Sequence, residues 1–371
     1  MKILQITKYF YPNPGGIESH VLGIAEGFAE RKNRTIVLAA NHPKTAKFEN
    51  HHGIEIRRSE ILFTLFRDPF TPGMLIDLFN EDYDVIHLHL PDPFNSLFAL
   101  IASLLKRKPL VVTYHADIIK DRWYHKIFKF FYGFFQNLVL SQSKIIIATS
   151  PDYAHGSETL KNFRGKLKIV PNFVDEKKFN PDVKSEKVKR KYRLKNKKVI
   201  LFLGRLIPYK GVSYLIKAFP DVKKNIKNAK LVIAGYGPLE KELKRMGKRM
   251  KDVLFITPTD DEVPALYNAS DVFVLPSITR QEAFGIVLLE AMSSSVPCIT
   301  TRISGMPFVI SDTGILVEPE NSEDLSAAIL KILSNENLAQ ELGRKARMRV
   351  EENFTRKRVI EKLLQIYEEI L

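Results

Sequence analysis

Short apolar runs alternate with longer segments of helical periodicity along the whole chain. The runs are rich in β-branched residues, end at Gly, Pro or polar residues, and are separated by helical segments. This alternation is typical of βαβ units, whose parallel strands are buried on both faces of a sheet. It predicts strands in the first half at 2–6, 34–39, 85–88, 110–114, 144–149 and 168–170, and in the second half at 199–203, 230–234, 253–256, 272–275, 297–301 and 314–317.

The two series of strands predict an α/β chain with two doubly wound parallel-sheet domains. A chain of 371 residues is also too long for one ordinary core, because a domain usually holds roughly 100 to 200 residues. We expect residues 1–175 and 176–355 to form Rossmann-like domains, with a helix at 356–371 that packs back on the first. Such sheets bind ligands at the carboxyl ends of their strands, so two facing domains would form one interdomain cleft.

Composition favours a folded protein of a reducing compartment. Apolar residues make up 45% of the chain and charged residues 27%, which excludes the composition of a disordered chain. The single cysteine, Cys298, lies in an apolar run and cannot form an intramolecular disulfide. Neither a signal peptide nor an apolar stretch long enough to span a bilayer is present. We therefore expect a cytoplasmic protein.

The net charge of +15 predicts attraction to anions such as nucleotides, anionic lipid surfaces or nucleic acid. The sequence contains no zinc-finger spacing, RNP-type strand or helix-turn-helix pattern. Nucleic acid is therefore not an expected partner, and the basic run at 187–198 is interpreted as a solvated surface.

The segment Pro276–Met292 has the pattern of an anion site at a helix start. It follows a strand, and exposed amides at the start of a helix favour a phosphate group. Glu282 and Glu290 flank this position, roughly 12 Å apart along a helix, a spacing that matches ribose and sugar on either side of a diphosphate. The alternative is a capped amphipathic helix with two solvated glutamates, although Glu290 lies in an apolar stretch where an unpaired carboxylate is costly.

A second candidate segment, Phe202–Gly211, joins a strand to a helix. The strand ends at Gly204, so Arg205 and Lys210 emerge at the ligand-binding end of the sheet. A guanidinium grips phosphate with paired donors and an ammonium acts as a point charge. Together they can neutralise a diphosphate leaving group without a metal; the alternative is two surface cations in a loop.

Seven short motifs occur in a fixed order along the chain. They are Gly15-Gly16-Ile17-Glu18, Asp84-Val85-Ile86-His87-Leu88-His89, Thr113-Tyr114-His115, Pro171-Asn172, Gly204-Arg205-Leu206 with Lys210-Gly211, Ala234-Gly235-Tyr236-Gly237-Pro238, and the segment from Glu282 to Glu290. In this order they resemble the retaining GT-B glycosyltransferases of family 4, which include bacterial phosphatidylinositol mannosyltransferases and many lipopolysaccharide mannosyltransferases. The resemblance covers nearly the whole chain and implies two Rossmann-like domains facing across a cleft.

The resemblance assigns roles to individual positions. It implies that Arg205 and Lys210 clamp the donor diphosphate and that Glu290 binds the ribose. Glu282 would contact the transferred sugar, and His115 would reach that sugar from the first domain. The backbone amides implied to approach the phosphates, the sugar or the acceptor are those of Gly15, Gly16, Ala283, Phe284, Gly285 and Ile286.

Two departures from the family pattern leave the nucleotide base open. The chain reads Ser304-Gly305-Met306-Pro307-Phe308 where members commonly have Gly-Gly-x-Pro-Glu. It also has Pro258 where members have a glycine near the base.

Three features that suggest other chemistry are interpreted as structural. Asp82 and Asp84 have the spacing of a metal-binding D-x-D motif, but Asp84 opens a buried strand. His87 and His89 share a strand face with no third ligand nearby, so we interpret them as packing residues. The run Gly235-Tyr236-Gly237 lacks the third dinucleotide-fingerprint glycine. We therefore expect no metal and no cofactor beyond the nucleotide-sugar substrate.

The resemblance implies a metal-independent hexosyltransferase that retains anomeric configuration and acts on a glycan or lipid-linked acceptor. The amino-acid sequence at 113–117 and 281–287 is similar to that of mannosyltransferases, so GDP-mannose is the expected donor. UDP-glucose and UDP-N-acetylglucosamine remain open. Two other functions remain as well: a nucleotide-sugar 2-epimerase of the same architecture, and a non-catalytic nucleotide-sugar-binding protein.

The segment Lys120–Leu140 mixes basic and aromatic residues. This composition is typical of an interfacial helix on anionic lipid, which would place the protein peripherally at the inner face of the cell membrane. Aromatic residues on many sides of the helix favour a mostly buried helix instead.

Overall fold

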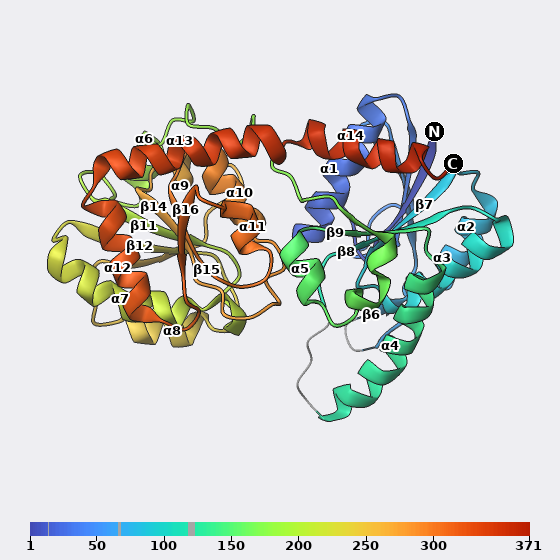
Figure 1. The fold of residues 1–371 in the computed structure, drawn as a ribbon, viewed down its shortest axis with the longest axis horizontal. Helices are drawn as coiled ribbons and strands as arrows, with labels where there is room; N and C mark the ends of the chain where they lie inside the picture. The colour runs from blue at the N-terminus through green and yellow to red at the C-terminus, as the bar shows by residue number, and fades with distance from the viewer. Residues whose placement is uncertain (14, 66–67, 118–122) are drawn as a thin grey trace. The chain divides into compact units, whose positions relative to one another are not determined.

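The computed structural model describes residues 1–13, 15–65, 68–117 and 123–371. The chain divides into two compact units. The first comprises Met1–Asn172 and Arg356–Leu371, and the second comprises Phe173–Thr355 (Figure 1). The expected boundary after residue 175 lies slightly beyond the point at which the units divide.

The first unit is built on a sheet with strand order β10-β9-β8-β7-β1-β2-β4-β3 in its described residues, parallel except for the edge strand β3. The bounds are β1 Lys2–Ile6, β2 Arg34–Ala40, β3 Phe48–His51, β4 Ile54–Ser59, β7 Val85–Leu90, β8 Leu110–Tyr114, β9 Ile145–Ala148 and β10 Leu167–Ile169. A separate ribbon pairs β5 Phe63–Leu65 with β6 Asp68–Phe70. From β1 the strand order runs outward through β2 and β4 on one side and through β7, β8, β9 and β10 on the other. The topological switch point therefore lies between β1 and β7.

The β3–β4 hairpin is an element that the hydrophobic pattern did not predict. Its tight turn places His52 and Gly53 at φ 49° and 83°, the left-handed conformations that a two-residue hairpin turn requires. The alternation in β3 is weak because the strand lies at the sheet edge and is only partly buried.

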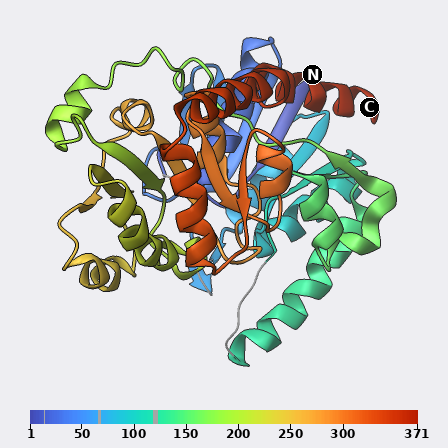
Figure 2. The same ribbon diagram turned by 60° about the vertical axis from the view of Figure 1, so that its left-hand side comes forward.

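The helices of the first unit cover both faces of its sheet. They are α1 Gly16–Glu30, α2 Gly73–Asn80, α3 Pro93–Lys106, α4 Trp123–Gln142, α5 Pro151–Gly156, the 3-10 helix η1 Leu160–Lys166 and α14 Arg356–Glu368. The C-terminal helix α14 packs on α1: a Cβ on Gly27 would lie 2.5 Å from Ile360 Cγ1, and Arg356 pairs with Glu26 and Glu30. Helix α4 extends away from the sheet in both views (Figures 1 and 2).

The second unit, all of whose residues are described, has a six-stranded parallel sheet in the order β13-β12-β11-β14-β15-β16. The strands are β11 Lys198–Leu203, β12 Ala229–Ala234, β13 Val253–Ile256, β14 Val272–Leu275, β15 Cys298–Thr301 and β16 Gly314–Val317, at the positions predicted from the sequence. This is the dinucleotide-fold order, whose switch point between β11 and β14 is the usual ligand site.

Helices flank this second sheet on both sides. They are α6 Glu186–Lys191, η2 Pro208–Lys210, α7 Val212–Asn225, α8 Glu240–Gly247, α9 Val263–Asn268, α10 Ile286–Ser293, α11 Met306–Ile310, α12 Ser322–Leu333 and α13 Glu336–Asn353. The core between sheet and helices consists of aliphatic and aromatic side chains, and Cys298 is buried within it. No helix in the described ranges combines the length and apolar character needed to cross a bilayer.

Candidate active site

The two candidate segments of the second unit meet at its switch point. The loop after β11 packs directly on the loop after β14: Ile278 N–H donates to the carbonyl of Tyr209 at 2.8 Å. Gly211 has φ 65°, and a Cβ there would lie 2.0 Å from the carbonyl oxygen of Pro276. Glycine is needed at this position for both conformation and close approach.

This packing brings Lys210 and Glu282 together. The Lys210 ammonium lies 2.5 Å from Glu282 Oε2, and the two side chains are only 11% and 10% exposed. Ser277 Oγ donates to the same carboxylate oxygen at 3.0 Å. Each charge therefore compensates the burial cost of the other, which is high for an unpaired ion. The sequence predicted a role for each residue but not the bond between them.

Arg205 follows Gly204 at the end of β11 and is exposed. Burial raises the pKa of the neighbouring Tyr209, and the charges of Lys210, Glu282 and Arg205 all act on its hydroxyl. The same small region therefore holds both predicted cations and one predicted carboxylate. Among the described residues no carboxylate forms an ion pair with Arg205, which leaves its guanidinium available to an anion.

The start of α10 lies beside these charges in the chain. Gly285 is the N-cap with φ 78°, and no side chain caps the helix. The preceding loop is fixed because the carbonyl of Ala283 accepts hydrogen bonds from Gly305 N at 3.1 Å and Ser304 Oγ at 3.3 Å. The uncapped amides at this end are donors suited to a phosphate oxygen.

Glu290 lies one turn before the end of α10. Tyr267 O–H donates to Glu290 Oε2 at 2.8 Å, and burial raises the pKa of this carboxyl to about 7. The positive charge of Lys210 acts in the opposite direction on the same group. Glu290 is partly buried and hydrogen-bonded to Tyr267, and Glu282 is buried, so the two glutamates are not the freely solvated pair of the alternative interpretation.

In the first unit, the predicted glycines lie where β1 leads into α1. Gly16 begins α1, and Gly15 precedes it with an extended backbone. A Cβ on Gly15 would lie 2.0 Å from Glu18 Oε2, so the Glu18 side chain folds back over this glycine. Asn13 Nδ2 donates to Glu18 Oε1 at 3.2 Å, and burial raises the pKa of the Glu18 carboxyl.

His115 follows β8 at the carboxyl edge of the same sheet. Its backbone N–H donates to the carbonyl of Leu90 at 3.1 Å, which places it beside the end of β7. Its Nε2 lies 3.1 Å from Nδ1 of His89. Burial lowers the pKa of His115 to about 4, so its imidazole is neutral at physiological pH.

The two histidines interpreted as packing residues form distinct hydrogen-bond sets. His87 contacts Thr113 Oγ1 and the hydroxyl of Tyr367, each at 2.6 Å, whereas His89 contacts His115 and Gln5. Within the described ranges no group of three or more His, Cys, Asp or Glu side chains has an arrangement suited to a metal ion. The link between His89 and His115 follows from strand register, which the sequence pattern alone does not give.

The D-x-D spacing at 82–84 lies at the opposite edge of the first sheet. Asp84 Oδ2 accepts from the backbone N–H of Lys2 at 2.8 Å, and Asp82 pairs with the Lys2 side chain. Both aspartates are therefore engaged at the amino end of β1.

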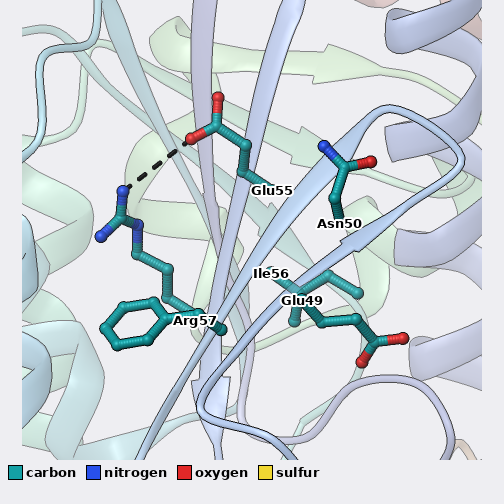
Figure 3. A pocket seen from close by; sticks show the side chains of 6 residues that line it. Glu49, Asn50, Glu55, Ile56 and Arg57 are labelled. Atoms are coloured by element: carbon teal, nitrogen blue, oxygen red, sulfur yellow. Dashed lines mark ion pairs between the residues drawn. The ribbon is translucent and has the colours of Figure 1, made fainter.

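A hollow of about 270 Å³ opens on the β3–β4 hairpin (Figure 3). Arg57 and Glu55 point toward each other there, 3.8 Å apart. Its lining residues are Phe48, Glu49, Asn50, Glu55, Ile56 and Arg57, none of which is a predicted site residue.

Two α/β sheets, parallel apart from the edge strand β3, are typical of the GT-B class of glycosyltransferases. Residues 184–349 match the family described as Glycosyl transferases group 1, and residues 14–178 match Glycosyltransferase Family 4. O-antigen chain mannosyltransferase C of Escherichia coli is 30% identical, with 100% of this chain and 99% of that protein covered. The chain belongs to this glycosyltransferase family, and the predicted enzyme class is confirmed.

Other similar proteins span comparable lengths. The phosphatidyl-myo-inositol mannosyltransferase of Mycobacterium leprae is 30% identical over 92% of this chain and 89% of its own. Sucrose-phosphate synthase of Thermosynechococcus elongatus superposes with a TM-score of 0.78 at 20% identity, covering 100% of this chain and 98% of that one. Alr3699/HepE of Anabaena, in complex with UDP and glucose, superposes with a TM-score of 0.79 at 20% identity, covering 99% of this chain and 99% of that one. These two structures confirm the GT-B fold.

Proposed function

We propose that this glycosyltransferase is a metal-independent, retaining hexosyltransferase that binds its nucleotide-sugar donor at the β11–β14 switch point. The proposal rests on one observation: Arg205, Lys210, Glu282 and the uncapped start of α10 belong to two loops that pack directly on each other. Cationic and carboxylate groups together suit a ligand that has both a diphosphate and sugar hydroxyls.

Each group has a defined task in the proposed reaction. Arg205 grips the diphosphate, and Lys210 uses its remaining N–H donors on the same group while Glu282 accepts a hydrogen bond from a sugar hydroxyl. The acceptor oxygen forms a bond to the anomeric carbon as the bond from that carbon to the phosphate oxygen breaks. Negative charge grows on the departing diphosphate, which takes the proton of the acceptor hydroxyl. Arg205, Lys210 and the amides of Gly285 and Ile286 stabilise that charge without reorganising, which is the main source of catalysis in such sites.

The first unit supplies the remaining groups. In the proposal, His115 contacts the donor sugar, and the loop at Gly15 and Gly16 approaches the phosphates or the acceptor. We expect donor binding to exclude water from the reacting atoms.

GDP-mannose is the proposed donor. Mannosyltransferases among the similar proteins support mannose. The complexes of Alr3699/HepE with UDP and glucose and with UDP-glucose support the alternative donor UDP-glucose. A thermal-shift panel of GDP-mannose, UDP-glucose and UDP-N-acetylglucosamine decides, because a ligand that binds only the folded state raises the melting temperature. We expect the largest shift with GDP-mannose; a larger shift with a uridine nucleotide would contradict the assignment.

Transfer assays separate the enzyme from its alternatives. A transferase consumes the donor only when an acceptor glycan or glycolipid is present, and the product keeps the anomeric configuration. Release of an altered sugar without acceptor would indicate the 2-epimerase, and donor binding without turnover would indicate a binding protein.

We also propose that the acceptor is reached at an anionic membrane surface. Helix α3 contacts both α2 and α4, and each of the three helices has an exposed apolar residue: Ile76 is 64% exposed, Leu105 69% and Phe134 63%. The sequences of α3 and α4 contain no Asp or Glu. Such a surface suits insertion beside anionic headgroups.

The described part of α4 has both buried side chains and exposed apolar side chains. Tyr132, Gln136 and Val139 are buried, whereas Phe134 and Leu138 are exposed. Residues 120–122 and the side chains of 123–131 lie outside the described residues. Cosedimentation with anionic liposomes tests the proposal: replacing Leu104 and Leu105 by Ser should weaken binding, while replacing the exposed Met348 by Ser should not. Equal binding by both variants would contradict it.

A further inference from the structure

Three polar side chains form a buried series of hydrogen bonds across adjacent strands of the first unit. Gln5 lies on β1, His89 on β7 and His115 directly after β8. His89 Nε2 lies 3.0 Å from Gln5 Oε1, and His89 Nδ1 lies 3.1 Å from His115 Nε2. Gln5 and His89 are almost fully buried, where polar groups are costly unless they are hydrogen-bonded.

The two imidazoles lie edge to edge. Their planes differ by only 21°, and their centroids are 5.4 Å apart while the bonded nitrogens are 3.1 Å apart. The centroid separation thus exceeds the nitrogen separation by about two ring radii, which is the arrangement of an in-plane N–H···N bond rather than of face-to-face stacking.

The acceptor at the Gln5 end of this hydrogen-bonded series determines which nitrogen of each imidazole carries the proton. In the structure Gln5 turns its amide oxygen to His89 and leaves its own Nε2 without a partner among the described residues. An amide oxygen only accepts, so in this orientation His89 Nε2 carries a hydrogen. A neutral imidazole has one donor and one acceptor, so His89 Nδ1 accepts. His115 Nε2 must then donate, which leaves His115 Nδ1 as the acceptor of its ring.

We propose that Gln5 and His89 are positioning residues that hold His115 in its Nε2–H tautomer, so that Nδ1 accepts a hydrogen bond from a hydroxyl of the bound sugar. This inference rests on the proposed function, which places His115 at the donor sugar. Burial lowers the pKa of both His89 and His115, which keeps both rings neutral as the N–H···N bond requires. The structure gives Nδ1 of His115 no partner among the described residues.

His87 provides a matched control. It lies on the same strand, is as buried as His89 and also makes two side-chain hydrogen bonds, but to Thr113 and Tyr367. Replacing either histidine by Leu removes two buried hydrogen bonds and creates an apolar side chain of similar volume. Only the change at residue 89 removes the partner of His115.

The first experiment measures the tautomer without any assay of activity. Nitrogen-15 NMR of the full chain labelled at its nine histidines distinguishes protonated from unprotonated ring nitrogens, and the His115→Asn variant identifies the His115 signals. We expect His115 to be protonated at Nε2 in the wild type and in His87→Leu, and to show a mixture of tautomers in His89→Leu. Protonation at Nδ1 in the wild type, or an unchanged tautomer in His89→Leu, would overturn the inference.

The second experiment measures transfer. We expect kcat to fall about tenfold or more in His89→Leu with little change in donor KM, because one oriented hydrogen bond is worth about this factor in the transition state. His89→Asn should recover part of the loss, since its amide oxygen replaces the Nδ1 acceptor. Equal kcat losses in His87→Leu and His89→Leu would show general destabilisation and overturn the positioning role.

The two readouts also separate this inference from the proposed function. If the wild type has no transferase activity with any acceptor, the proposed function fails while the tautomer measurement still stands. If transfer is normal and the tautomer of His115 differs from the expected one, only the positioning role fails.

Discussion

The carboxyl edges of the two sheets carry different chemistry. In the second unit the groups are charged: Lys210 pairs with Glu282, and Arg205 is exposed beside them. In the first unit the corresponding edge holds neutral imidazoles, whose pKa values are lowered by burial. In the proposed reaction, the charged groups of the second unit bind the diphosphate, and the imidazole of His115 in the first unit contacts a hydroxyl of the sugar.

Removing the carboxylate of the charged edge should have the largest effect. Glu282→Gln keeps the side-chain volume and a carbonyl acceptor for Lys210, yet we expect transfer to fall on the order of a thousandfold, because a preorganised contact in the reacting site is lost. Steady-state transfer assays measure it, with circular dichroism to show that the fold is retained. The exposed Glu318→Gln is the control, and near-normal turnover of Glu282→Gln would remove Glu282 from the site.

Neutralising the exposed cation should weaken catalysis less. We expect Arg205→Ala to lower kcat/KM on the order of a hundredfold, the effect of losing one charge-assisted contact to the leaving group. Arg205→Lys should recover only part, because an ammonium cannot form the paired contact. Arg302→Ala, which removes an exposed arginine of the same unit, should behave as wild type; an equal loss there would indicate a general charge effect.

Glu290 links the charged edge to pH. Its pKa is raised to about 7 in the folded state from a usual 4.5, so the folded protein binds the proton more tightly than the unfolded chain. Stability is therefore greatest below pH 4.5 as far as this group is concerned, and falls as the pH rises to 7. Glu290→Gln should raise the free energy of unfolding at pH 8 relative to pH 5 by up to about 3 kcal/mol.

Donor binding should show the opposite dependence on pH. Ribose hydroxyls donate to the ionised carboxylate, so affinity for the nucleotide should decrease as the pH falls below 7 in the wild type. Calorimetry at pH 5.5 and 8 on wild type and Glu290→Gln tests both the pH dependence of the unfolding free energy and that of the donor affinity. Glu318→Gln is the control. A wild-type affinity independent of pH would contradict the ribose role.

The smallest expected effect concerns the packing of the two loops. Gly211→Ala places a Cβ at φ 65° and against the carbonyl of Pro276, which should destabilise the fold by about 1–3 kcal/mol. Gly165→Ala is the matched control, because nothing lies within 4 Å of its added Cβ. Urea unfolding measures both, and equal midpoints would show that the loops do not need this close contact.

Periodicity and turn chemistry predicted most of the fold because parallel strands buried on both faces produce apolar runs that local sequence reveals. The β3–β4 hairpin escaped because its edge strand is only partly buried. In the candidate site, the residue types at 205, 210 and 282 were predicted, but the ion pair between Lys210 and Glu282 depends on two loops from separate strands. The bond between His89 and His115 likewise depends on strand register, which a pattern along the chain does not encode.

In the proposed function, Arg205 and Lys210 receive the diphosphate of a nucleotide sugar. The most direct measurement is calorimetric titration of the nucleotide sugar that gives the largest thermal shift, into wild type and into the Arg205→Ala, Lys210→Met double variant. We expect the dissociation constant to rise at least about a hundredfold in the double variant, since two charge-assisted contacts are lost. An unchanged dissociation constant in a folded double variant would contradict it.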